Sequence, residues 1–310
     1  MAEGFLFISG LIGLWIGTKW VVKSAIGIAE RHQLSHAFVG LAILAVGTDL
    51  PEVFISIDAS ILHLQGLESS GIITGNAIGS SICQMSIVLG IAGLFHNFTF
   101  SKKELFRDGL ALLASIGLLF AVGWDGVVSR VEGLVLLVAY LIYYVVLWRS
   151  NRKTITNQVT HEHQSNLKLA GYLLIGLVAL VFSSHLVVKN AIFFAEKWGV
   201  AQSFVGIVLI GLGTGLPELA VSIGAAMRKS VEMSVGNIMG SNIFDTLVLV
   251  GLGGAISQIS MESNLLRFDL LVQLGISLLV LIFLKTQRGI SKVEAVVLIV
   301  LYLVYVGVKI

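Results

Sequence analysis

Two short segments hold the residues best suited to chemistry, and their sequences are nearly identical. GTDLPE at 47–52 recurs as GTGLPE at 213–218. Glu52 and Glu218 each fall near the middle of a long apolar stretch that contains no Lys or Arg. If these stretches cross a membrane, an unpaired carboxylate there costs about 2.5–3.5 kcal/mol even on a permissive insertion scale. A bound cation would remove that cost, so the pattern favours a cation site; the alternative is a protonated, hydrogen-bonded structural glutamate.

The two motifs also contain the only prolines of the chain, Pro51 and Pro217. A proline inside a helix removes one backbone N–H and frees the carbonyl four residues earlier, here those of Gly47 and Gly213. In hydrocarbon a free carbonyl is costly unless something satisfies it, and a dehydrated cation would do so. Two equivalent prolines, each followed by a glutamate, are therefore more specific evidence than a single kinked helix.

Further oxygen-bearing side chains occur at matching positions in the next apolar stretch of each copy. They are Ser80 and Gln84 in the first copy, and Ser241 and Asp245 in the second. Each pair is spaced i, i+4 and so lies on one helix face. Hard oxygen donors suit calcium or sodium, whereas zinc, copper or iron would call for His or Cys. The one cysteine, Cys83, is predicted to be a packing residue.

Two asparagines, Asn76 and Asn237, recur as well, each directly after a glycine. An asparagine at such a place can bind an ion or cap a broken helix. The neighbouring glycines favour helix caps, with ion binding as the alternative.

The composition shows which kind of element must position these residues. Of 310 residues, 56% are hydrophobic and 12% charged, and the mean hydropathy is +0.94. A soluble domain carries about 25% charged residues. The composition therefore excludes an ordinary soluble enzyme, a disordered chain and a nucleic-acid binder, and leaves a polytopic membrane protein. One cysteine excludes an internal disulfide, and the N-terminus lacks the basic region of a cleaved signal peptide.

A membrane-crossing helix needs about 20 mostly apolar residues. On that basis the sequence predicts ten spans: 4–29, 36–63, 71–97, 107–123, 131–149, 167–195, 202–227, 231–256, 267–285 and 290–308. Residues 1–150 then form one transmembrane unit, 151–166 a solvated linker, and 167–310 a second unit. The linker contains His161 and His163, and a metal-binding tract is its alternative reading.

The distribution of Lys and Arg predicts the orientation of the spans. With the N-terminus outside, the inner connections carry thirteen of these residues and the outer ones four. The sequence therefore predicts both termini outside and the 151–166 linker in the cytoplasm, in a chain located in the plasma membrane. Lys19, Lys23 and Lys189 fall within spans, where extension of their side chains towards the interface accounts for them.

The matching motifs belong to an internal repeat. The register that pairs Gly47 with Gly213 holds around the GTxLPE motifs, and a slightly shorter offset holds further along, where GNAIGSSI at 75–82 matches GNIMGSNI at 236–243. Five spans separate equivalent points, and an odd number inverts the second copy relative to the membrane. Inverted repeats place their site near the midplane, where broken helices of both halves meet. The alternative is a duplicated structural bundle without transport.

At these motifs the chain resembles the calcium/cation antiporter superfamily, and in particular its sodium/calcium exchanger branch. The resemblance covers essentially the whole chain. It implies an all-α membrane protein of ten transmembrane helices in two inverted five-helix repeats, which transports by alternating access. It also implies that the first helix of each half slides to open alternate sides of the membrane.

The resemblance implies a set of ion ligands. Glu52 and Glu218 would be the central ligands, and Thr48 and Thr214 would add hydroxyl and backbone oxygens. Ser80, Ser241 and Asp245 would line sodium positions, while Ala45 and Gly211 would offer backbone carbonyls. This chain departs from the family pattern at Asp49 and Gly215, where serine is common, and at Gln84, where Asn or Asp is common. Asp49 is expected to be a ligand, with a role in attracting cations along the access path as the alternative.

The sequence therefore predicts an antiporter that exchanges a divalent cation, calcium, against sodium. Its partners would be inorganic cations and the lipid bilayer, and it would act as a monomer, without enzymatic activity or a cofactor. The extra carboxylate of Asp49 leaves proton coupling and potassium dependence open as alternatives. A cation channel and an intramembrane enzyme are the alternatives from other classes, and the duplication of the polar groups argues against both.

Overall fold

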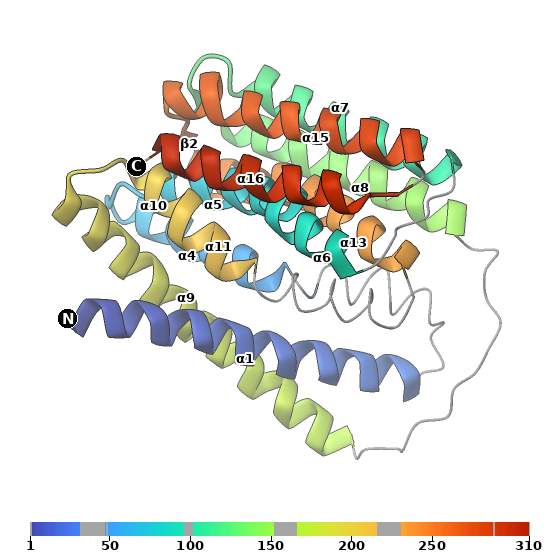
Figure 1. The fold of residues 1–310 in the computed structure, drawn as a ribbon. Helices are drawn as coiled ribbons and strands as arrows, with labels where there is room; N and C mark the ends of the chain where they lie inside the picture. Colours follow the sequence, from blue (N-terminus) through green and yellow to red (C-terminus); the bar gives the residue numbers. More distant parts are fainter. Residues whose placement is uncertain are drawn as a thin grey trace.

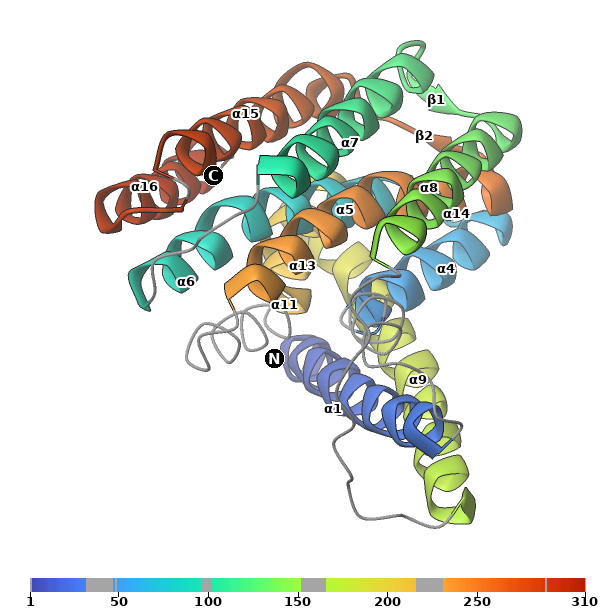
Figure 2. The same ribbon diagram turned by 90° about the vertical axis from the view of Figure 1, so that its right-hand side faces the viewer.

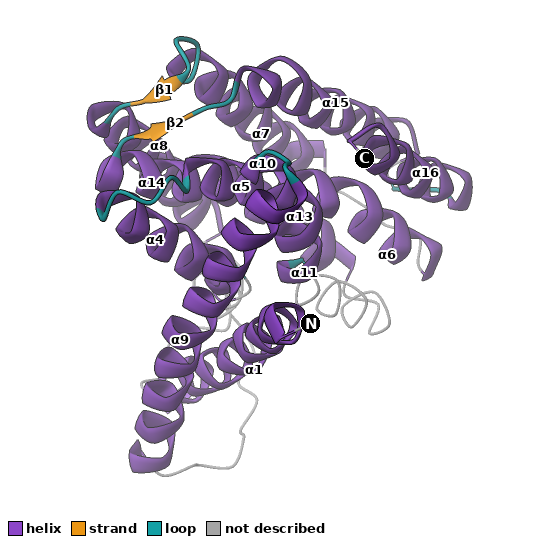
Figure 3. Ribbon diagram, turned by 90° about the vertical axis from the view of Figure 1, so that its left-hand side faces the viewer, coloured by secondary structure: helices purple, strands orange, loops and turns teal. Residues whose placement is uncertain are grey.

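The computed structural model describes residues 2–31, 47, 49–95, 102–151, 166–215, 231–287 and 289–309. These residues are almost entirely helical, and Figure 3 shows one short pair of strands at one end of the helices. Three of the predicted ion ligands, Ala45, Thr48 and Glu218, lie outside the described residues. The fold is an all-α membrane fold, as the sequence predicts.

The helices follow the predicted spans in order along the chain (Figure 1). The first half contains α1 (Ala2–Arg31), α4 (Leu50–Leu64), α5 (Ser70–Cys83), the π-helical segment η2 (Gln84–Val88), α6 (Leu89–Phe95), α7 (Lys102–Val122), β1 (Val127–Val128) and α8 (Arg130–Asn151). The second half begins with α9 (Asn166–Trp198), α10 (Gln202–Val205), η3 (Gly206–Ile210), α11 (Gly211–Thr214), α13 (Val231–Phe244), η4 (Asp245–Leu249) and α14 (Val250–Ser257). It ends with β2 (Ile259–Ser260), η5 (Leu265–Asp269), α15 (Leu270–Gln287) and α16 (Lys292–Lys309).

Seven of the described helices are long and apolar enough to cross a membrane by length and composition. They cover 2–21, 70–94, 105–122, 130–149, 167–198, 238–257 and 265–286. Together with α4, the α10–α11 segment and α16, they account for the ten predicted spans. Apolar side chains of α8 such as Val131, Leu141 and Ile142 are more than half exposed, as expected for residues that face lipid.

Contacts between connections confirm which of them share one side of the membrane. β1 and β2 pair antiparallel, and the Met261 N–H donates to the Gly126 carbonyl at 2.8 Å. The Gln202 side chain donates to the Glu68 carbonyl at 2.6 Å, which places the loop before α5 beside the start of α10. Figure 1 shows both chain ends on this same side. These connections and both chain ends lie on one side of the bundle, as the ten-span prediction requires.

The repeat extends through the fourth and fifth helices of each half. Ser129 and Glu132 form a reciprocal helix cap at the start of α8, and Ser291 and Glu294 form the same cap at the start of α16. The two caps lie at opposite ends of the bundle, because α8 follows β1 whereas α16 ends on that side. The second half is therefore inverted relative to the first.

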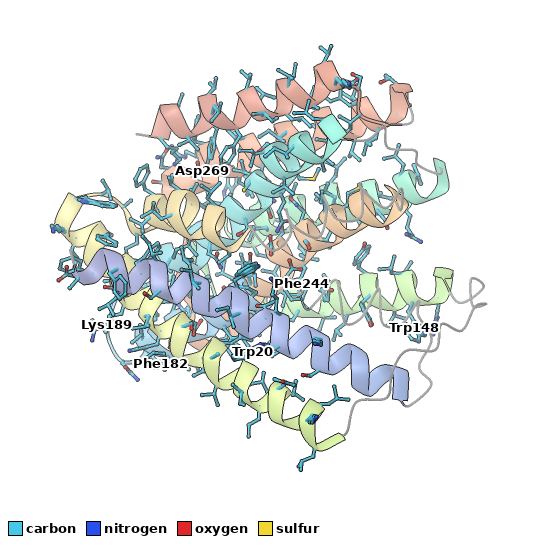
Figure 4. The ribbon with its side chains drawn as sticks, turned by 60° about the horizontal axis from the view of Figure 1, so that its bottom comes forward. Trp20, Trp148, Phe182, Lys189, Phe244 and Asp269 are labelled. Carbon is cyan, nitrogen blue, oxygen red and sulfur yellow. The ribbon has the colours of Figure 1, made fainter. Side chains whose placement is uncertain are left out.

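The helices form a main bundle and a separate pair at its edge. In Figure 2, α5 and α13 lie in the middle of the bundle, and nearly every residue of α5 is buried. In the same view α1 and α9 cross each other as a separate pair at one edge, where α9 also contacts α4. Phe182 and Lys189 are exposed on α9, away from the bundle (Figure 4). Lys19 on α1 lies over the Trp15 ring, 3.6 Å from its centroid, and is exposed.

Candidate cation site

The first GTxLPE motif contains the start of a helix. α4 begins at Leu50, directly after Asp49, and Pro51 occupies its first turn, where a missing N–H costs nothing. In the second copy α11 ends at Thr214, and the motif continues beyond the described residues. The start of α4 directly after Asp49 places the Glu52 side chain in the first turn of a helix inside the bundle, where it is fully buried.

Glycines bring the two halves into main-chain contact at the centre. A Cβ at Gly79 of α5 would lie 2.5 Å from the Ile207 Cα of η3. From the other side, a Cβ at Gly206 would lie 2.9 Å from the Asn76 N, and one at Gly211 would lie 2.8 Å from the Gly79 carbonyl carbon. Only glycine permits such an approach. As a result the hydroxyl oxygens of Ser80 and Thr214 are 3.4 Å apart, although 134 residues separate them.

Three carboxylates are buried in the interior, close enough to repel one another. Glu52 and Asp245 have no exposed surface and Asp49 has 1%. Asp49 repels Glu52, and both repel Asp245. The hydroxyl of Thr214 lies near Glu52, and that of Ser241 lies near Asp49. The burial of Asp49 is at odds with its alternative placement along an open access path.

These carboxylates lack the partners that buried charges need. Among the described residues, both carboxylate oxygens of Glu52 and of Asp245 accept no hydrogen bond at good geometry, and nor does Asp49 Oδ1. No Lys or Arg in the described part of the chain acts on any of the three. Within that part, no three His, Cys, Asp or Glu side chains converge closely enough to hold a metal ion alone. A cation bound here would therefore need neutral oxygens as well.

The neutral groups form a bridge between the two repeats. Asn242 Nδ2 donates to Gln84 Oε1 at 2.9 Å and to the Ile238 carbonyl at 3.1 Å. The Gln84 amide in turn lies near Asp245. Among the described residues its Nε2 makes no hydrogen bond at good geometry. Cys83 is buried beside Tyr302 of α16.

The expected role of Asn76 as a helix cap is wrong. α5 runs without a break from Ser70 to Cys83, so position 76 lies in its interior. The Asn76 side chain instead donates to the Glu52 carbonyl at 3.4 Å and ties α5 to the first turn of α4. Gly75, which the sequence suggests as part of a broken helix, instead faces the main chain of Ser203 and is a site of close packing. α13 is likewise continuous from Val231 to Phe244, so Gly236–Asn237 is not a break either.

Two π-helical segments start at equivalent site residues. η2 begins at Gln84, and η4 begins at Asp245, the matching position of the second copy. A π-helical turn disturbs the regular backbone ladder and is often found at functional sites. Ser86 and Thr246 donate to the carbonyls of Ile82 and Asn242 within these segments, so side chains satisfy part of the disturbed ladder.

The structure therefore gathers seven predicted side chains and one predicted main-chain position into one interior region. They are Asp49, Glu52, Ser80, Gln84, Thr214, Ser241 and Asp245, with Gly211 against the main chain of Ser80. Asp58 of α4 pairs with His185 of α9 at 3.4 Å.

Sequence reasoning missed Asn242 and Thr246. Both are fully or almost fully buried polar residues, one helical turn apart in an otherwise apolar helix. Polar side chains at i, i+4 within an apolar span are the signal that would have found them.

Inverted repeats that meet at buried, unneutralised carboxylates define an ion-coupled membrane transporter. A family model described as sodium/calcium exchanger protein matches residues 3–149 and 168–310. The chain belongs to this family.

Similar proteins match this chain over nearly its full length. The chain is 31% identical over 301 residues to an uncharacterized membrane protein of Methanocaldococcus jannaschii, covering 97% of this chain and 96% of that one. It is 29% identical over 341 residues to the sodium/calcium exchanger MaX1 of Methanosarcina acetivorans, again covering 97% and 96%. A solved structure of the sodium-calcium exchanger NCX_Mj, soaked with Na+ and Sr2+, is 30% identical, with a TM-score of 0.67 and coverage of 99% and 98%.

Proposed function

We propose that this protein is an antiporter that moves calcium and sodium in opposite directions across the membrane by alternating access. The observation that carries the proposal is the group of three buried carboxylates, Asp49, Glu52 and Asp245, with no basic partner among the described residues. A structural role would call for protonated or paired carboxylates. Mobile cations are the partner that such a site can both take up and release.

The proposed ligands are those that the sequence predicts. Glu52 and Glu218 bind the ion at the centre, with oxygens of Thr48 and Thr214 and the carbonyls of Ala45 and Gly211 beside them. Asp49, Ser80, Gln84, Ser241 and Asp245 complete the polar surface. Calcium takes six to eight oxygen ligands in flexible geometry, and a set drawn from both halves meets that need.

Exchange rather than leakage follows from the charge of the site. An empty site holds several unneutralised carboxylates, and moving them through a low-dielectric interior is costly. One calcium or several sodium ions neutralise them, so only loaded states change access. The crossed pair of α1 and α9, which lies at the edge of the bundle in Figure 2, is the element that slides.

The proposal includes the placement of the chain. Units 1–150 and 167–310 form the two halves, the 151–166 linker is cytoplasmic, and both termini lie outside the plasma membrane. The protein works as a monomer, and transport needs neither a cofactor nor a chemical step.

Flux in proteoliposomes tests the function. Purified protein is reconstituted, and radiolabelled calcium uptake is measured under an outward gradient of sodium, potassium or protons. We expect uptake with the sodium gradient, strong loss in Glu52→Gln, and wild-type uptake in Glu68→Gln, whose side chain is 61% exposed. Uptake driven by protons alone would overturn sodium coupling, and uptake without any counter-ion would indicate a channel.

A further inference from the structure

The continuous helical stretch of η5 and α15 carries a buried polar stripe that lies outside the repeated site motifs. Asp269, Gln273 and Ser277 are spaced i, i+4, i+8 and so share one face. Their exposed fractions are 0%, 1% and 0%. A polar stripe inside a membrane protein is costly unless its members are satisfied or have a function.

The first half has the same helix without the stripe. In the register that pairs Gly75 with Gly236, Asp108 of α7 is equivalent to Asp269, whereas Leu112 and Ile116 stand at the positions of Gln273 and Ser277. Both leucine and isoleucine are buried at those positions. The two polar residues therefore belong to the second half alone and are not needed for the repeated architecture.

Asp269 is explained by local pairing. It accepts hydrogen bonds from Tyr305 at 2.8 Å and from Lys309 at 2.7 Å, which join the end of η5 to α16. Asp108 accepts from Tyr143 in the same way, at 3.5 Å. In Figure 4, Asp269 lies on the opposite side of the bundle from α1 and α9, so this pairing is remote from the sliding pair. No such pairing accounts for Gln273 or Ser277 among the described residues.

Gln273 connects to the ion site through a chain of hydrogen bonds. Its Nε2 donates to Thr246 Oγ1 at 3.1 Å, and that hydroxyl donates to the Asn242 carbonyl at 2.8 Å. Asn242 donates to Gln84, which lies near Asp245. The amide of Gln273 thus fixes the hydroxyl of the residue next to Asp245, in the first turn of the π-helical segment η4.

The first repeat has no counterpart of this chain. Met85 stands at the position of Thr246 and has no hydroxyl, and Leu112 stands at the position of Gln273. The oxygens Gln273 Oε1 and Ser277 Oγ find no hydrogen-bond partner among the residues that the structure describes. Thr246, the residue next to the carboxylate of the second repeat, is therefore hydrogen-bonded from α15, whereas the Gln84 amide of the first repeat accepts its hydrogen bond across the repeats, from Asn242.

We propose that Gln273 is a positioning residue that holds Asp245 through Thr246, and that it sets the apparent affinity for the monovalent coupling ion. This inference rests on the proposed antiport of calcium and sodium. Asp245 brings one negative charge next to the Gln84 amide, and one charge matches a monovalent cation. Asp49 and Glu52 are two carboxylates close together in sequence, which suit a divalent cation.

Two nearly isosteric substitutions remove the link while they preserve volume. Gln273→Met deletes the donor, and Thr246→Val deletes the acceptor. Sodium-gradient-driven calcium uptake is measured in proteoliposomes as a function of each ion. We expect either variant to raise the KM for sodium about 5- to 10-fold, the factor that one buried hydrogen bond contributes. The KM for calcium should stay within about 2-fold, and the double variant should match Thr246→Val, because that substitution already breaks the contact with Gln273.

Ser115→Ala is the matched control, because among the described residues this buried serine of α7 donates only within its own helix, to the Leu112 carbonyl at 2.7 Å. It should change neither KM. Unchanged sodium dependence in both variants, a parallel rise in both KM values, or additive effects in the double variant would overturn the inference. If the wild type shows no sodium-dependent uptake, the proposed function itself fails, which is a distinguishable result.

Discussion

Replacement of Gly79 by alanine tests whether main-chain contact between α5 and η3 sets the geometry of the ion site. A Cβ at residue 79 would lie 2.5 Å from the Ile207 Cα, whereas ordinary van der Waals contacts lie at 3.4–4 Å. The obstructing atoms are main chain and cannot rotate away. The two segments must therefore separate by about 1 Å, the shortfall in this contact.

The separation acts directly on the proposed ligands. Ser80 follows Gly79 in sequence, and its hydroxyl lies 3.4 Å from that of Thr214 across the same contact. Overpacking of this kind costs about 1–3 kcal/mol of stability. A shift of about 1 Å at a reacting or binding group can cost roughly 100-fold in activity. We therefore expect a folded protein whose calcium uptake at low calcium is reduced at least roughly tenfold.

The assay is radiolabelled calcium uptake in proteoliposomes, together with thermal unfolding in detergent. Gly117→Ala is the matched control, because a Cβ at this position of α7 would meet nothing within 4 Å. The control should keep wild-type uptake. If Gly79→Ala keeps both the calcium affinity and the unfolding temperature of the wild type, the close approach does not set the geometry of the site.

Three further predictions concern the outer pairing, the added carboxylate and the orientation. Asp269→Leu leaves the Lys309 ammonium, whose side chain is 9% exposed, without its carboxylate. We therefore expect thermal unfolding to show a loss of about 3–5 kcal/mol in stability, which Lys309→Met should partly restore. An unchanged unfolding temperature would contradict this. Asp49→Ser removes one of the three buried carboxylates and should raise the Kd for calcium roughly tenfold in equilibrium binding, equivalent to about 1.4 kcal/mol; tighter binding would show that repulsion among the carboxylates dominates. Asp125→Cys in a Cys83→Ala background should react with an impermeant thiol reagent from outside intact cells, and protection there would place the β1 side in the cytoplasm.

The helical spans and the inversion could be predicted because they depend on patterns along the sequence. Apolar length marks a span, and an odd number of spans between matching motifs inverts the second copy. The caps at Ser129 and Ser291 and the pairings of Asp108 and Asp269 show that the comparison of the two copies could have been carried to the end of the chain. The sequence contained that signal.

The cross-repeat contacts could not be predicted in the same way. The bond from Asn242 to Gln84 joins residues 158 positions apart and depends on how two helices are rotated about their axes. The cap assigned to Asn76 failed because glycine beside asparagine is typical both of a break and of close packing. The contact of the Ser203 main chain with Gly75 shows that close packing, and not a helix break, explains this glycine.

The central claim is that buried carboxylates couple calcium movement to sodium movement in the opposite direction. The most direct test measures radiolabelled sodium efflux and calcium uptake in the same proteoliposomes, for wild type and Glu52→Gln. The account predicts that, in the wild type, each flux requires the other ion on the opposite side, and that both fluxes fall together in the variant. Sodium efflux that continues without external calcium, or calcium exchange that survives in Glu52→Gln, would contradict it.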